Sequence, residues 1–248
     1  MKLFSASFFL TFGLLGLASL SATPKPASVS SIRADDLVEF ETLDESRQAL
    51  IRNALSLTQK ELRYLFGSNS PDKGGMDCSG AVQHAVLETG IEDVPRSSYT
   101  FYQWVEKEGD LVKTPGVTNV DDPVFASLQP GDLLFWQGTY ETGKRNPPIS
   151  HVMIYLGTLR EDGEGVVFGA SDGRRYRGKR INGVSVFDWK VPSATSKSKF
   201  VGYAPIPGLI SDSELDEKAE ADSGGAKERP KVIKSALEKI FGRREPDR

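Results

Sequence analysis

The chain has 248 residues, a formal net charge of −3 and a single cysteine. The near-balanced charge argues against nucleic acid as the main partner, and one cysteine excludes an internal disulfide. About 190 residues between an apolar N-terminus and a highly charged C-terminus suit one domain with its own hydrophobic core.

Residues 1–22 have the pattern of a secretory signal peptide. Lys2 supplies the positive charge, Leu3–Leu20 contains no acid or base, and small residues ending at Ala22 offer a cleavage site. The apolar run is short for a membrane-spanning helix. We therefore expect an exported protein, secreted or periplasmic, in which a Pro/Ser/Ala-rich linker over residues 23–40 precedes the domain.

The first half of the domain has helical patterns. A capping box, Thr42-x-x-Glu45, predicts a helix that runs to about residue 60. Asp77 is a typical N-cap for a second helix ending near Gly90, which places Cys78 in the first turn. Free backbone N–H groups and the helix dipole favour a thiolate there. A third helix is predicted over residues 98–108.

The second half of the domain has strand patterns. Apolar and aromatic segments separated by turn residues predict five strands, at 132–136, 149–156, 165–170, 184–189 and 200–206. Helices followed by a run of strands indicate an α+β domain over residues 41–208. Its N-terminal helices are expected to pack on an antiparallel sheet of about five strands, with the nucleophile at the start of a helix.

The segment 209–248 differs in composition from the domain. Seven acidic residues lie within 211–228, and seven basic residues lie within 229–248. The apolar spacing within 230–242 predicts a basic amphipathic helix. This tail has three interpretations: it docks on the domain, it makes weak contact with a partner, or it adsorbs on an anionic envelope surface.

A cysteine nucleophile needs a base, and the chain has two histidines. His84 lies six positions after Cys78 on the same predicted helix, about 240° around its axis, so the two side chains point apart. His151 opens the strand predicted at 149–156. A cysteine early on a helix and a histidine late on a strand is the order of papain-like thiol hydrolases. The structural alternative to a catalytic role is a strand histidine whose ring hydrogen bonds to backbone groups.

Five short motifs together resemble the NlpC/P60 family of papain-like cysteine peptidases. The resemblance spans residues 45–205, and the order of the motifs makes it specific although each alone is short. It implies hydrolysis of peptidoglycan stem peptides, at the γ-D-glutamyl bond to a diamino acid, with Cys78 as nucleophile, His151 as general base, and no metal or cofactor. In chain order the motifs are Tyr64-x-x-Gly67, Asp77-Cys78-Ser79-Gly80, Pro95-Arg96-Ser97, Leu128-Gln129-Pro130-Gly131-Asp132-Leu133 and Ile149-Ser150-His151-Val152.

The resemblance also implies a substrate-binding role for three neighbours of the cysteine. Tyr64, Asp77 and Ser79 match the family's pocket for the free amine end of the stem peptide. A carboxylate and hydroxyls are suitable partners for an ammonium group. The structural alternatives are an N-cap role for Asp77 and a core position for Tyr64. The backbone N–H of Cys78 is expected to be one oxyanion donor.

One position departs from the family's pattern. The third catalytic residue is a polar side chain, often histidine, about twelve residues after the base, and Gly169 stands at that place here. An imidazole without an orienting partner loses control of its tautomer. Water, a backbone carbonyl, Ser171 and Asp172 are the candidate substitutes. Two alternatives to the endopeptidase therefore stay open. One is an N-acetylmuramoyl-L-alanine amidase, and the other, suggested by this departure, is a wall-binding module with weakened catalysis.

A run of basic residues, 174–180, follows the same strand. A solvated loop is the default interpretation. The alternative is that this run attracts the carboxylates of stem peptides toward the thiolate.

Overall fold

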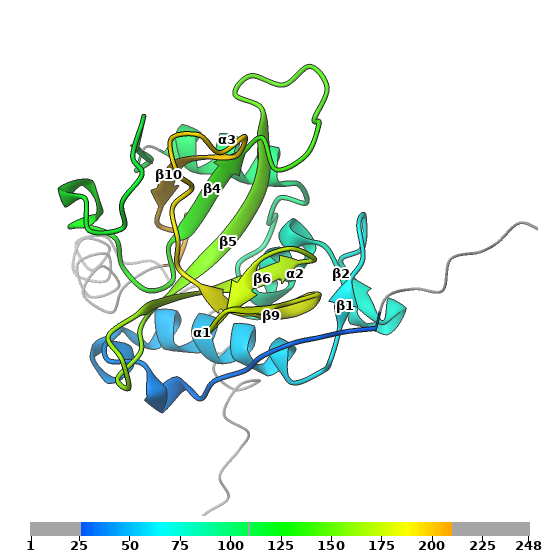
Figure 1. Ribbon diagram of the computed structural model, residues 1–248. Coiled ribbons are helices and arrows are strands. Elements are labelled where there is room, and N and C mark those ends of the chain that lie inside the picture. The colour runs from blue at the N-terminus through cyan, green and yellow to red at the C-terminus, as the bar shows by residue number, and fades with distance from the viewer. Residues whose placement is uncertain (1–25, 109, 210–248) are drawn as a thin grey trace, which may run out of the picture.

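The computed structural model describes residues 26–108 and 110–209 (Figure 1). The predicted signal peptide and the predicted amphipathic helix 230–242 lie outside these residues. Among the helices of the described ranges, none has the length and apolar character needed to cross a membrane.

Three helices lie in the first half of the domain: α1, Glu45–Thr58; α2, Cys78–Leu87; and α3, Ser98–Glu108. The bounds of α3 are those predicted. The N-cap of α1 is Asp44, whose carboxylate accepts the Arg47 N–H, while Thr42 ends a 3-10 turn. The predicted capping box is therefore wrong, because the helix begins two residues later than the motif suggested.

The strands form a six-stranded sheet in the order β3-β10-β4-β5-β6-β9, and every neighbouring pair is antiparallel. The five predicted strands are present, and the edge strand β3 is an addition too short to give a sequence pattern. The α+β architecture is confirmed. The bounds are β3, Val112–Lys113; β4, Leu133–Gln137; β5, Ile149–Thr158; β6, Gly165–Ser171; β9, Gly183–Asp188; and β10, Lys199–Ala204.

Two short ladders lie outside this sheet. Strand β1, Arg63–Tyr64, pairs in parallel with β2, Gly75–Met76, directly before α2. Strand β7, Arg175–Tyr176, pairs with β8, Lys179–Arg180, so the basic run of the sequence is a hairpin.

The six-stranded sheet is buried on both faces. The helices share one core with the strand residues that point toward them, among them Val152, Ile154 and Phe168. The other face carries a second cluster rich in aromatic rings, which includes Trp136, Met153 and Trp189. Burial on both faces explains why the strands have nearly continuous apolar sequences rather than alternating ones. His151 lies on this aromatic face, opposite Trp136 in the ladder between β4 and β5.

Part of the segment predicted as a linker packs on the domain. The Ser28 N–H bonds the Asn182 carbonyl, and Leu37 is fully buried beside Leu159. Residues 28–40 therefore belong to the folded unit, and the folded part of the chain begins before residue 41.

Candidate active site

Cys78 is the first residue of α2 and faces the start of β5. The backbone N–H groups of Val152 and Ser79 lie within hydrogen-bonding reach of its sulfur. Because Val152 directly follows His151 in β5, the sulfur lies beside the backbone of the strand that carries the predicted base. The side chain of His84, in the middle of α2, does not line the cavity beside His151.

The resting thiol is neutral, contrary to the sequence prediction. Cys78 is 6% exposed. Burial, and then the charge of Asp77, raise the pKa of Cys78 to about 11, against the smaller lowering effects of the two backbone donors and Arg96. The prediction was wrong because it assumed a solvated helix start, whereas this one is covered by protein and lies beside a carboxylate.

The Asp77 carboxylate accepts five hydrogen bonds from the protein. The Gly80 N–H donates at 2.6 Å and the Gly67 N–H at 2.9 Å. The Arg96 guanidinium donates twice, at 3.0 and 2.7 Å, and the Ser79 hydroxyl donates at 3.2 Å. Arg96 also donates to the Ser79 oxygen at 2.9 Å. The N-cap role of Asp77 is confirmed. Of the three side chains predicted to bind an ammonium group, Asp77 and Ser79 already have hydrogen-bond partners within the fold.

Tyr64 is half-buried at the end of β1 and lines the cavity. Its pKa is raised, mainly by burial and then by the nearby charges of Cys78, Asp77 and Asp172. Cys78, Asp77 and Asp172 therefore all lie within electrostatic range of the Tyr64 hydroxyl.

His151 lies at the start of β5 with its ring packed edge-on against Trp136, at 5.7 Å between centroids. Its Nε2 is buried and has no hydrogen-bond partner among the described residues. Burial, and then the charge of Arg174, lower the pKa of His151 well below its usual value, so the resting imidazole is neutral. Backbone groups therefore do not hydrogen bond to this Nε2, as the structural alternative would require.

The Met153 thioether fills the space beside Gly169, where the family resemblance would place a third catalytic residue. A Cβ on Gly169 would lie 2.9 Å from Cε and 3.2 Å from Cγ of Met153. Of the substitutes considered from the sequence, the Ser171 hydroxyl accepts the N–H groups of Gly173 and Arg174 at 3.2 Å. Neither Ser171 nor Asp172 hydrogen bonds to His151, which leaves its Nε2 unpartnered.

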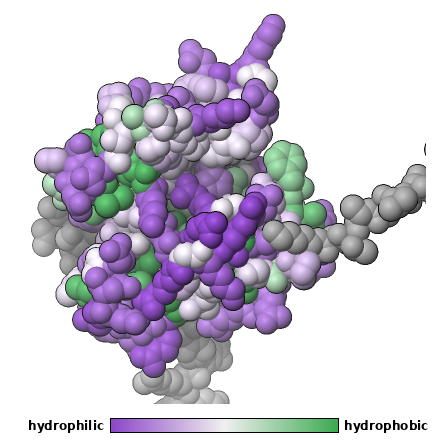
Figure 2. Space-filling model, in the orientation of Figure 1, coloured by the Kyte–Doolittle hydropathy of each residue, from purple (hydrophilic) through white to green (hydrophobic). Residues whose placement is uncertain are grey.

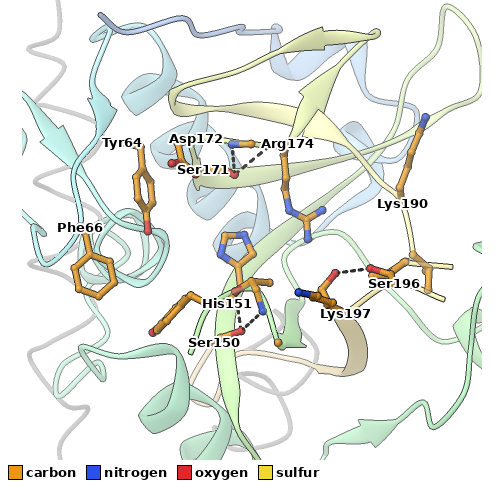
Figure 3. A pocket seen from close by; sticks show the side chains of 17 residues that line it. Tyr64, Phe66, Ser150, His151, Ser171, Asp172, Arg174, Lys190, Ser196 and Lys197 are labelled. Carbon is orange, nitrogen blue, oxygen red and sulfur yellow. Dashed lines mark hydrogen bonds between the residues drawn. The ribbon is translucent and has the colours of Figure 1, made fainter. Parts of the chain in front are cut away.

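A cavity of about 860 Å³ opens beside His151 (Figure 3). Its walls differ: Tyr64, Phe66 and Tyr140 supply aromatic rings, whereas Arg174, Lys190 and Lys197 supply positive charge. Cys78 is not among the lining side chains. Figure 2 shows a mostly hydrophilic face with a hollow near its centre. The described residues contain no group of three or more His, Cys, Asp or Glu that could hold a metal ion.

The basic run separates into residues with different surroundings. Arg177 pairs with Glu161 at 2.7 Å and with Asp162 at 2.9 Å, both at the surface. Arg174 is half-buried, with its guanidinium carbon 4.1 Å from the Trp136 ring centroid. Sequence reasoning missed the individual roles of Arg96 and Arg174, although Arg96 stands within one of the quoted motifs.

A cysteine at a helix start, set against a histidine at a strand start in a helix-plus-antiparallel-sheet domain, defines a papain-like fold. The model of the NlpC/P60 family matches residues 61–183, and this part of the chain belongs to that family of cell-wall peptidases. The matched range contains Tyr64, Asp77, Cys78, Ser79 and His151.

A solved structure described as a novel NlpC/P60 endopeptidase from Photobacterium damselae subsp. piscicida is 13% identical, with a TM-score of 0.31. The match covers 62% of this chain and 38% of that one, so the chain spans well under half the length of this neighbour. A TM-score this low adds nothing to the family assignment. No curated protein matches the chain.

Proposed function

We propose that the protein is an exported cysteine endopeptidase that hydrolyses peptidoglycan stem peptides at the γ-D-glutamyl bond to a diamino acid. The family of residues 61–183 supports a cell-wall peptide substrate. The observation that carries the proposal is the position of the Cys78 sulfur at the N–H of Val152, next to the histidine that lines the cavity.

The chemistry proceeds from a neutral pair. Burial raises the pKa of Cys78 and lowers that of His151, so the proton moves from sulfur to imidazole as sulfur attacks the carbonyl, rather than beforehand. The Cys78 backbone N–H, which the helix does not use, donates to the developing oxyanion. The imidazolium then protonates the departing amine, leaving a thioester on Cys78. Water that His151 deprotonates hydrolyses this thioester and regenerates the thiol.

Export and surface contact belong to the proposal on sequence grounds. The pattern of residues 1–22 supports a secreted or periplasmic location. Weak envelope or partner contact through the tail at 209–248 is a prediction from its charge pattern.

A second candidate is a wall-binding module with weakened catalysis. The observation that favours it is the unpartnered Nε2 of His151, which follows from the Met153 side chain lying over Gly169. The two functions differ in turnover but not in the ligand class.

Digestion of purified muropeptides by the full-length protein without its signal peptide, followed by mass spectrometry, tests the proposal. The expected product carries a new amino terminus on the diamino acid. Cys78→Ala should abolish its formation, His151→Ala should lower kcat by about 10³-fold or more, and the matched histidine variant His84→Ala should leave it unchanged.

Three other outcomes contradict the proposal in different ways. A new L-alanine amino terminus would indicate the amidase. Retention on peptidoglycan without any product would indicate the binding module. Unchanged cleavage by Cys78→Ala would exclude Cys78 as the nucleophile.

A further inference from the structure

Arg174, on the basic wall of the cavity, interacts electrostatically with both predicted reacting groups, His151 and Cys78. Its guanidinium stacks on Trp136 at 4.1 Å, and the same indole meets the His151 ring at 5.7 Å. It is close enough to Cys78 for a thiolate there to raise the pKa of Arg174, against the larger lowering effect of burial. Arg174 is therefore one ring away from the imidazole and within electrostatic range of the sulfur.

This half-buried cation has no counter-ion in the described part of the chain. Arg177, on the same hairpin, has Glu161 and Asp162, and Arg180 donates to the Asp172 carbonyl at 3.1 Å. No acidic side chain pairs in this way with Arg174 in residues 26–108 or 110–209. Burial lowers the pKa of Arg174 to about 10, so it keeps its charge at neutral pH. A partly desolvated cation that faces a cavity and lacks a counter-ion is suited to bind an anion.

The cavity gives that anion a position along the substrate. Figure 3 shows Tyr64 and Arg174 on opposite sides of the His151 imidazole, with Lys197 on the Arg174 side. Tyr64 lies on the wall beside Cys78 and Asp172, where the family resemblance places the amine end of the stem peptide. A peptide held there and passing the imidazole puts the part beyond the scissile bond next to Arg174.

We propose that Arg174 binds a free carboxylate in the leaving part of the substrate, on the diamino acid or the residue after it. This inference rests on the proposed function and narrows it to stem peptides whose leaving part is unblocked. The planar guanidinium suits a carboxylate, with which it forms paired hydrogen bonds that a carboxamide cannot match.

The test uses two pairs of synthetic stem peptides. In one pair the peptides differ only in a free carboxylate or a carboxamide on the diamino acid, and in the other only at the residue after it. In at least one of the two pairs, the wild-type protein should cleave the free acid with a kcat/KM about 10- to 100-fold higher than that of the carboxamide, mostly through a lower KM. Arg174→Met should abolish that preference, and Arg174→Lys should keep part of it. Arg175→Met, an exposed neighbour on the same hairpin, should retain the wild-type ratio.

The ratio between the two members of a pair separates substrate binding from effects on the catalytic groups. Arg174 also lowers the pKa of His151, so its removal changes kcat for both members alike. Equal cleavage within both pairs by the wild-type protein would overturn the inference and leave the proposed function intact. An unchanged ratio in Arg174→Met would also overturn it. Failure of the wild-type protein to cleave any of the four peptides would remove the proposed function, and this inference with it.

Discussion

The two sides of the candidate active site differ in how completely their polar groups are paired. On the nucleophile side, the Asp77 carboxylate accepts five hydrogen bonds and fixes the first turn of α2. On the base side, His151 Nε2 and Trp136 Nε1 are buried without partners in the described structure, and Arg174 lacks a counter-ion there. Buried polar groups are normally paired, so the base side is the part that a ligand would complete.

The difference follows from what each side is built of. The nucleophile side uses a loop and helix start close in sequence, tied down by one arginine from the next segment. The base side is assembled from β4, β5 and β6, and the side chains packed nearest to His151 include the aromatic Trp136. Met153 occupies the space where a polar partner for His151 would have to enter. Hydrogen bonds thus fix the helix start that carries the nucleophile, whereas the base is held mainly by the packing of its ring.

The largest expected effect comes from breaking the paired side. Asp77→Ala leaves the Arg96 guanidinium and two backbone N–H groups without their acceptor. The free energy of unfolding should fall by about 3–5 kcal/mol, measured by urea denaturation. The control is Asp172→Ala, an exposed carboxylate on the same cavity, which should cost less than about 0.5 kcal/mol. Equal stability of the two variants would show that the Asp77 network is not structural.

A smaller effect is expected from supplying the unpaired side with a partner. Gly169→His alone should lose about 1–3 kcal/mol of stability, because its Cβ meets Met153 at 2.9 Å. Adding Met153→Gly should restore part of that stability and bring an imidazole within reach of His151 Nε2. We expect kcat of the double variant to rise roughly tenfold over the wild type, because tautomer control is regained.

The matched control for that gain is Met153→Gly alone, which opens space without adding a polar group. It should lose stability through the cavity and gain nothing in kcat. A double variant that folds well but turns over no faster would show that the unpaired Nε2 does not limit the rate.

Local signals in the sequence predicted much of this arrangement. The Asp77 N-cap, the helix start at Cys78 and the bounds of α3 each depend on a few adjacent residues, and the structure confirms them. The strand that carries His151 also begins where its apolar pattern begins. The five motifs then identified the family before any contact was known.

What the sequence did not predict depends on burial and on register between strands. The neutral state of Cys78 follows from the layers that cover it, which no spacing along α2 reveals. Met153 on β5 contacts Gly169 on the neighbouring strand β6, so its effect on His151 appears only in the folded sheet. The sequence predicted a solvated Arg174 because this arginine stands in a run of basic residues, 174–180.

The most direct measurement is the rate at which a thioester forms on Cys78 from an activated ester of the stem peptide, followed by intact-protein mass spectrometry. An activated ester needs no protonation of its leaving group, so the rate reports the deprotonation of Cys78. Because burial raises the pKa of Cys78 to about 11, its thiolate fraction without a base is small at pH 7 and grows about tenfold per pH unit.

The wild-type protein should therefore acylate Cys78 readily at pH 7, and His151→Ala should do so far more slowly. The gap between the two should narrow as the pH approaches 11, where Cys78 ionises without help. Equal acylation of the two proteins at pH 7, or acylation at a residue other than Cys78, would contradict the assignment of His151 as the base of a Cys78 nucleophile.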